Sequence, residues 1–246
     1  MHNYKLLIQY DGTRYNGWQR QGNTENTIQG KLNEIIGKYL GEEIDIAGSG
    51  RTDAGVHALG QVASFKTNLF FDVEKFITDI NGFLPKDIRV LFAENADDRF
   101  HARLSAISKT YEYVIDNGRV SDVFARKYAW RVEEKLDVNQ MRLAAEKLMG
   151  THDYTSFCGN KKFKKSPVRT VTDIAIKEQR DKITIAYTGD GFLQNMVRIL
   201  TGTLVEVGLG KRSAGAMTEI LHAKNREAAG MMAPPEGLFL KEVYYK

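Results

Sequence analysis

The sequence predicts an α+β protein made of two ferredoxin-like (RRM-like) α/β halves that share a largely antiparallel central sheet flanked by helices. Two observations lead to this prediction. Apolar spacing over the first half gives the order β-α-β-β-α-β, which is that of a ferredoxin-like unit, an architecture that RNA-binding sheets also use. The alternation of strands and helices then restarts near residues 104–108. We therefore expect two domains, residues 1–105 and 106–246, with the candidate functional loop in the first.

In the first half, short β-branched or alternating runs indicate strands, and apolar residues three or four positions apart indicate helices. The turn signal Asp11-Gly12 ends the first strand, and Pro85 closes the second helix. The expected elements are strands at 6–10, 44–46, 61–65 and 88–93, and helices at 28–39 and 73–84, with Gly41 as the stop of the first helix.

The second half follows the same rules. Two of its strands are expected to pair as an antiparallel hairpin across residues 177–181. The expected elements are strands at 110–115, 168–176, 183–187 and 238–245, and helices at 138–148, at 193–204 and near 217–221.

Composition limits the class of protein. The chain has 246 residues, of which 42% are hydrophobic, enough for a sizeable core. Its single cysteine, Cys158, excludes an internal disulfide, and there is no C-x-x-C pair for zinc. The apolar run at the start is too short for a signal peptide, and no apolar stretch is long enough to span a membrane. We therefore expect a cytoplasmic protein.

The formal net charge is only +4, so the distribution of charge says more than its sum. Residues 161–165 read Lys-Lys-Phe-Lys-Lys, and Arg169 follows shortly after. This basic run is either a solvated loop or a surface that contacts nucleic-acid phosphates, an interaction that weakens with salt. Lys109, Arg126 and Lys127 extend the same surface if the fold brings them together.

The most informative stretch is residues 47–58, A-G-S-G-R-T-D-A-G-V-H-A, a glycine-rich loop between two expected strands. Such glycine density is typical of backbone that takes left-handed angles or lets a ligand approach closely. If Arg51 to Asp53 is extended, both side chains face the same way, and the guanidinium would lower the pKa of the aspartate by ~1–3 units. Asp53 is then either an ionised nucleophile or electrostatic stabiliser, or the capping residue of a tight turn.

Two other kinds of site fit the loop poorly. The third glycine of a dinucleotide-binding loop is missing, and no Gly-Lys-Ser/Thr follows for a phosphate loop. A metal site needs clustered ligands, and Asp53 and His57 supply only two. The other candidates, His101, His152 and His222, are scattered along the chain. A metal-free site is therefore favoured.

Two further residues each have two open interpretations. Tyr111 shares a strand face with Tyr113 and Ile115, so it either packs in the core or faces a cleft and stacks on a base, worth ~1–3 kcal/mol. Arg198 lies opposite the apolar stripe of the helix at 193–204. It is either a solvated residue of a polar face or a cation held beside the site.

Motifs in a fixed order extend over nearly the whole chain. They are D-G-T-x-Y-x-G-W-Q-x-Q from Asp11, G-R-T-D-A-G-V-H from Gly50 with G-Q-V from Gly60, K-T-Y-x-Y from Lys109, H-D-Y from His152, S-P-V-R-T from Ser166, G-F-L from Gly191 with M-V-R from Met196, A-P from Ala233 and G-L from Gly237. Together they resemble the tRNA pseudouridine synthase A family, for which R-T-D-A-G-V-H alone is specific. The lysine-rich segment 158–165 departs from the family pattern, which affects expected RNA contacts and not the chemistry.

The resemblance implies the pseudouridine synthase fold and an isomerase that converts uridine to pseudouridine in the anticodon stem-loop of tRNA, at positions 38, 39 and 40. It implies no cofactor, no metal, and a homodimer that binds tRNA across a basic cleft. Asp53 would be the catalytic residue, and Arg51 would hold its carboxylate and help to occupy the space left by the flipped uridine. Tyr111 would stack on the target base, and Arg198 would pair with Asp53.

Two alternatives stay open at this point. One is a non-catalytic RNA-binding module on the same fold, in which Asp53 is only a turn residue. The other, more remote, is a metal-dependent hydrolase that uses Asp53 and His57.

Overall fold

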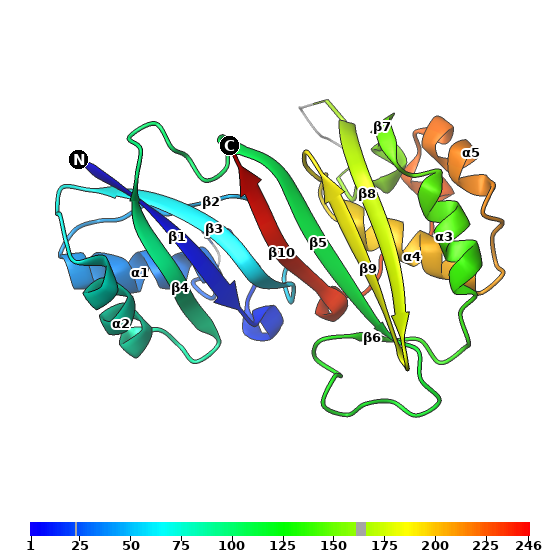
Figure 1. Cartoon of the computed structure of the whole chain (residues 1–246), viewed down its shortest axis with the longest axis horizontal. Helices are drawn as coiled ribbons and strands as arrows, with labels where there is room; N and C mark the ends of the chain where they lie inside the picture. Colours follow the sequence, from blue (N-terminus) through cyan, green and yellow to red (C-terminus); the bar gives the residue numbers. More distant parts are fainter. Residues whose placement is uncertain (23, 161–165) are drawn as a thin grey trace. The chain divides into compact units, whose positions relative to one another are not determined.

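A computed structural model describes residues 1–22, 24–160 and 166–246 (Figure 1). The chain folds into two compact units, Met1–Ile107 together with Phe239–Lys246, and Ser108–Leu238. Each unit has its own mostly antiparallel strands and its own helices. This mixed α/β content confirms the predicted fold class. The basic run 161–165 lies outside the described residues.

The sheet of the first unit is centred on β1, which runs antiparallel to both of its neighbours. The last strand of the chain runs parallel to β3, with Phe239 opposite His57 and Leu240 opposite Ala58. Local spacing predicted this strand but assigned it to the second domain, because spacing carries no information on which distant strand is the partner. The strands are, in spatial order, β4 (Ile88–Ala96), β1 (His2–Tyr10), β3 (His57–Thr67) and β10 (Leu238–Tyr245), with the short β2 (Ala47–Gly48) beside β3.

Two helices cover one face of this sheet, and both were predicted. Gly41 ends the first of them with a φ of 68°, a left-handed angle that lets the chain leave a helix without side-chain strain. Phe76 of the second helix packs against Phe65 of β3 with ring centroids 6.3 Å apart. Tyr4 of β1 stacks on Phe65, so alternate β1 side chains such as Lys5 point to the opposite face. The helices are α1 (Ile28–Leu40) and α2 (Val73–Phe83), and the turn after β1 is the 3₁₀ helix η1 (Gly12–Arg14).

The structure corrects the expected strand at 44–46. This β-branched run is not a strand, and side chains of α1 take both backbone hydrogen bonds of Ile46. Gln29 Nε2 donates to the Ile46 carbonyl at 2.8 Å, and Ile46 N donates to Asn33 Oδ1 at 3.2 Å. Residues 61–65 do lie in a strand, but they are buried on both faces and not on one, and Gln61 is fully buried.

The second unit has a sheet in which β9 lies between β5 and β8, all antiparallel. The predicted hairpin is present, with its turn tightened to Arg180 and Asp181. The strands are β5 (Ala106–Asp116), β9 (Lys182–Gly189), β8 (Val168–Gln179) and β7 (Gly150–Asp153), with β6 (Trp130–Arg131) beside β5.

Helices pack against this second sheet. Tyr187 of β9 and Thr201 of α4 share a buried hydroxyl hydrogen bond of 2.8 Å, and Arg142 of α3 donates to the Ile176 carbonyl of β8. The helices are α3 (Val138–Glu146), α4 (Met196–Gly208) and α5 (Ala216–Ala223), with 3₁₀ helices η2 (Thr155–Phe157), η3 (Arg226–Ala228) and η4 (Pro235–Gly237). Within the described residues, no helix combines the length and apolarity needed to cross a membrane.

Candidate active site

The loop that carries Asp53 (residues 49–56, the aspartate loop) connects β2 to β3 and is fixed at its start by β3 itself. Ser49 N donates to the Val62 carbonyl at 2.7 Å, and Ser49 Oγ donates to Gln61 Oε1 at 2.7 Å. Gln61 Nε2 donates in turn to the Gly50 carbonyl at 2.9 Å. Both Ser49 and Gln61 are fully buried, so breaking these hydrogen bonds would leave buried polar groups without hydrogen-bond partners, which is unfavourable. The loop therefore starts from a rigid support.

The other side of the aspartate loop is held by residues 11–18, which follow β1. Trp18 N donates to the Thr52 carbonyl at 3.1 Å, and Gly55 N donates to the Tyr15 carbonyl at 3.2 Å. The buried hydroxyls of Tyr10 and Thr52 share a hydrogen bond of 2.8 Å. These contacts bracket Asp53 on both sides along the chain.

Two glycines of the 11–18 segment make this close approach possible. A Cβ on Gly17 would lie 2.5 Å from the Thr52 carbonyl oxygen, and Gly17 has a φ of 85°, which side chains rarely adopt. A Cβ on Gly12 would lie 2.0 Å from the Val56 carbonyl oxygen. The first motif of the chain therefore has a physical explanation, since its glycines allow the backbone to lie directly against the aspartate loop.

Asp53 itself is half-buried at the tip of the loop. Its carbonyl accepts a hydrogen bond of 3.1 Å from Val56 N, which closes a tight turn through Gly55 at a φ of 78°. Arg51 is exposed, and its Nε donates to Gln19 Oε1 at 3.0 Å. The guanidinium is thus anchored to Gln19, which directly follows the 11–18 segment.

His57, the other titratable group of the motif, is buried at the start of β3 with 1% of its surface exposed. Its Nδ1 accepts a hydrogen bond of 3.1 Å from Gly12 N and lies 3.2 Å from Asp11 Oδ1. Its ring stacks on Phe239 with centroids 4.8 Å apart. These contacts give His57 a structural role, because they tie β3 to the turn after β1 and to the last strand. Over residues 1–22, 24–160 and 166–246, no three His, Cys, Asp or Glu side chains form a group suited to a metal ion.

Tyr111 and Arg198 both lie in the second unit. Tyr111, on β5, is 8% exposed and packs edge-on against Phe192 at a centroid distance of 5.3 Å. Arg198 is also only 8% exposed, although it lies on the helix face that was a candidate for solvation. Its Nε donates to the Ala233 carbonyl at 2.7 Å, and its own carbonyl accepts from Ala233 N at 3.0 Å. The interpretation of Arg198 as a solvated residue is therefore wrong, because residues beyond the helix cover that face.

The predicted site residues thus fall into two pairs. Asp53 and Arg51 lie two positions apart on the aspartate loop, and Tyr111 and Arg198 lie in the second unit. That all four converge stays a prediction. Sequence reasoning missed the groups that hold the loop, above all Gln19 and Gln61, which it quoted as parts of motifs without a role. Gln61 is a polar residue inside an otherwise apolar strand, and this contrast was the one feature of the sequence that could have indicated its structural role.

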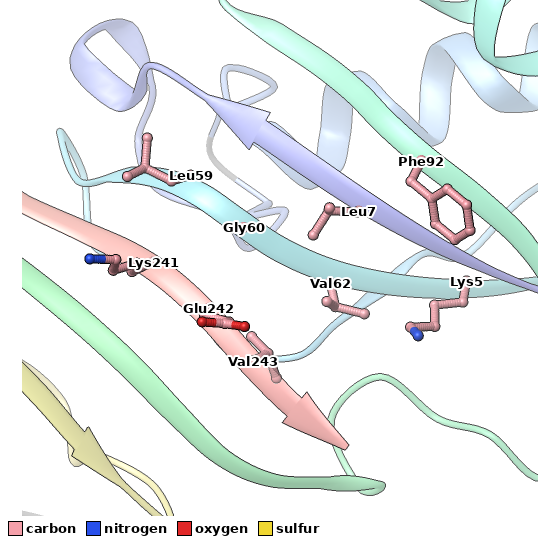
Figure 2. A pocket seen from close by; sticks show the side chains of 9 residues that line it. All are labelled: Lys5, Leu7, Leu59, Gly60, Val62, Phe92, Lys241, Glu242 and Val243. Carbon is pink, nitrogen blue, oxygen red and sulfur yellow. The ribbon is translucent and has the colours of Figure 1, made fainter. Parts of the chain in front are cut away.

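An open hollow of about 360 Å³ lies on the face of the first sheet opposite α1 and α2 (Figure 2). Leu7 of β1, Val62 of β3 and Phe92 of β4 line it, together with two lysines and one glutamate. None of its lining residues belongs to the aspartate loop. The assignment of a catalytic site therefore rests on the loop and not on this hollow.

Comparisons with known proteins agree with the motifs. The family model described as tRNA pseudouridine synthase matches residues 6–104 and 144–246, which include Asp53 and Arg198 but not Tyr111. A tRNA pseudouridine synthase A 2 of Bacillus cereus is 46% identical over 245 residues, covering 100% of both chains. The tRNA pseudouridine synthases A of Bacillus sp. (strain KSM-64) and Thermoanaerobacter sp. (strain X514) are 47% and 44% identical over the same full lengths.

The fold, the motifs and the family model define an RNA-modifying isomerase. The chain belongs to the tRNA pseudouridine synthase family, with relatives of the A type along its whole length. The enzyme class that the motifs predicted, an isomerase, is thereby confirmed. The family's activity is the isomerisation of uridine in tRNA.

Proposed function

We propose that this protein converts uridine to pseudouridine in the anticodon stem-loop of tRNA, at positions 38, 39 and 40, and that Asp53 is its catalytic carboxylate. The observation that carries the proposal is the construction of the aspartate loop. Hydrogen bonds from β3 and from residues 11–18 fix its backbone on both sides of Asp53. Holding a reactive group in place before substrate binds is how a protein lowers the entropic cost of a reaction.

The reaction needs such a carboxylate. The N-glycosidic bond between uracil N1 and ribose C1′ breaks, the base turns within the site, and C5 forms a new bond to C1′. The proton on C5 leaves, and N1 gains one, so the product is an isomer. Positive charge develops on the sugar as the first bond breaks, and an ionised carboxylate stabilises it or bonds to the carbon, as in glycoside cleavage. Addition of the carboxylate to the uracil ring is the third route open to Asp53.

The other site residues have distinct proposed roles. Arg51 helps to occupy the space that the flipped uridine leaves in the stem, and its exposure at the loop suits contact with RNA. Tyr111 stacks on the target base, and Arg198 pairs with Asp53. Flipping a base out of a stem costs a few kcal/mol, which stacking and phosphate contacts must offset.

The proposal also covers the oligomeric state, location and cofactor requirement of the enzyme. We expect a cytoplasmic homodimer that binds one tRNA across a basic cleft and works without a cofactor or metal ion. Tyr111 packs edge-on against Phe192, and Arg198 is held by the Ala233 carbonyl, which supports roles in packing and positioning for these two residues.

Tritium release tests the proposal. Transfer RNA carrying tritium on uridine C5 loses the label when C5 bonds to C1′, so wild-type protein should release it in proportion to the uridine converted. Asp53→Asn keeps the size of the side chain and removes its charge, and should lower the rate by on the order of 10³-fold or more. Asp45→Asn is a matched control, because Asp45 is an exposed aspartate shortly before the loop. It should be as active as wild type.

Other outcomes decide between the alternatives. Binding of tRNA without any release by wild type would support a non-catalytic RNA-binding module. Equal release by Asp53→Asn and wild type would refute the assignment of Asp53. Release that disappears with a chelator would favour metal-dependent chemistry. Substrates with a single uridine at position 38, 39 or 40 then show whether the anticodon stem-loop is the target.

A further inference from the structure

A short segment of the second unit, residues 229–233 (the strap), lies along one face of α4. Three residues of that face, Arg198, Gly202 and Glu206, are spaced four positions apart and therefore line up along the helix. Each of them contacts the strap, so the strap follows α4 for two turns, on the order of 12 Å.

The middle of the strap touches the helix backbone directly. A Cβ on Gly202 would lie 2.0 Å from the Met231 carbonyl oxygen, so only glycine permits this contact. At the next residue of α4, Thr203 Oγ1 accepts a hydrogen bond of 2.9 Å from Gly230 N. The strap therefore has little room to move away from or along the helix without losing these contacts.

Glu206 holds the first half of the strap. Its Oε1 accepts a hydrogen bond of 2.9 Å from Met231 N, and its Oε2 pairs with Arg212 Nε. Arg212 also donates from Nη1 to the Ala228 carbonyl at 3.0 Å. Burial raises the pKa of Glu206, but the hydrogen bonds from Arg212 and Met231 outweigh it and hold the pKa below its ordinary value. One ionised carboxylate thus joins the strap to the helix and to Arg212.

The second end of the strap holds Arg198. The Ala233 carbonyl accepts from Arg198 Nε at 2.7 Å, and Ala233 N donates to the Arg198 carbonyl at 3.0 Å. A guanidinium is planar, so a bond to Nε fixes the plane in which its two terminal nitrogens lie. The next residue, Pro234, accepts a hydrogen bond of 2.7 Å from the Tyr113 hydroxyl.

We infer that Glu206 is a positioning residue for Arg198: its carboxylate anchors the strap, and the strap orients the guanidinium through Ala233. This inference rests on the proposed role of Arg198 in the isomerisation. Glu206 contacts Met231 and Arg212 and not Arg198, so it acts on Arg198 only through the strap. Its replacement should therefore impair the chemical step and leave tRNA binding almost unchanged.

Glu206→Gln is the informative variant. The amide oxygen can still accept from Met231 N, but the amide NH₂ then faces the Arg212 Nε–H, so two donors meet where an ion pair was. We expect kcat for tritium release to fall ~10-fold, with KM for tRNA within about twofold of wild type. Glu219→Gln on α5 is the matched control, because Glu219 is exposed, and it should behave as wild type.

A double-mutant cycle separates positioning from a general structural role. Arg198→Lys has no Nε–H with the same geometry and cannot be oriented by Ala233. In that background Glu206→Gln should lower kcat by less than about twofold. The same ~10-fold loss in both backgrounds, or no loss in either, would overturn the inference.

Hydrogen exchange provides a readout that does not depend on activity. The Ala233 amide, which donates to Arg198, should exchange at least ~10-fold faster in Glu206→Gln than in wild type or Glu219→Gln. Unchanged exchange at Ala233 would refute the inference even if activity fell. Wild-type protein that releases no tritium would refute the proposed function, and the exchange result would then decide whether Glu206 holds the strap.

Discussion

The aspartate loop and the strap hold their key residues by different physical means. The aspartate loop is held by neutral groups: backbone amides, the Tyr10 and Thr52 hydroxyls, and glycines that permit backbone-to-backbone contact. The strap also uses a glycine contact, but its first half depends on the charges of Glu206 and Arg212. The aspartate loop should therefore be sensitive to added carbon atoms and insensitive to pH, whereas the strap should respond to pH.

The largest effect on stability and activity is expected from replacing Gly17. Gly17→Ala places a Cβ 2.5 Å from the Thr52 carbonyl oxygen at a φ of 85°, so it should lower the free energy of unfolding by about 2–4 kcal/mol and abolish most tritium release. Urea unfolding and the tritium assay measure the two effects. Gly41→Ala is the control, since Gly41 has a similar φ of 68° with no atom near its Cβ position. Gly41→Ala should lower the free energy of unfolding by only about 1 kcal/mol. Equal costs at the two glycines would show that contact with the loop is unimportant.

The next effect concerns the hydroxyl pair that holds Thr52. Tyr10→Phe leaves the buried Thr52 hydroxyl without its partner, and should cost about 1–2 kcal/mol in urea unfolding. Burial raises the pKa of Tyr10, so the hydroxyl stays protonated, and the cost should be the same at pH 5 and pH 9. Tyr244→Phe, at an exposed tyrosine, is the comparison and should change stability by less than about 0.5 kcal/mol. A cost of Tyr10→Phe that varied with pH would contradict the neutral character of the loop.

The strap should show the opposite behaviour. Because the folded pKa of Glu206 lies below its ordinary value of 4.5, its stabilising contribution is complete above that value and is lost as pH falls through the folded pKa. Glu206→Gln should be about 1–3 kcal/mol less stable than wild type at pH 7. The difference should shrink steadily below about pH 4. Thermal or urea unfolding across pH 3 to 7 measures it, and a difference that stays constant with pH would show that the charge of Glu206 is not involved.

Local spacing predicted most of the fold. It located α1 with its Gly41 stop, α2, the hairpin of β8 and β9, and the last strand, because each is a periodic apolar pattern that packs on one face. It failed at 44–46, where Gln29 and Asn33 of α1 take the hydrogen bonds that a strand would use. A side chain that reaches across from a helix leaves no periodic signal.

The candidate site was predicted less completely. The motif identified Asp53 and Arg51, but the contacts that hold them come from residues 11–19 and Gln61, which lie outside the motif. The burial of Arg198 was missed for a related reason. Helical periodicity assigns it to a polar face, and only the tertiary structure shows that the strap covers that face. Spacing describes one element at a time, whereas both sites are built from pairs of segments.

A rigidly held Asp53 should carry out the chemistry separately from tRNA binding. A single-turnover experiment, with enzyme in excess over C5-tritiated tRNA and tRNA affinity measured in parallel, separates the two. Asp53→Asn should bind tRNA within about threefold of wild type and release tritium on the order of 10³-fold more slowly. Release by Asp53→Asn at the wild-type rate would show that Asp53 does not carry out the chemistry.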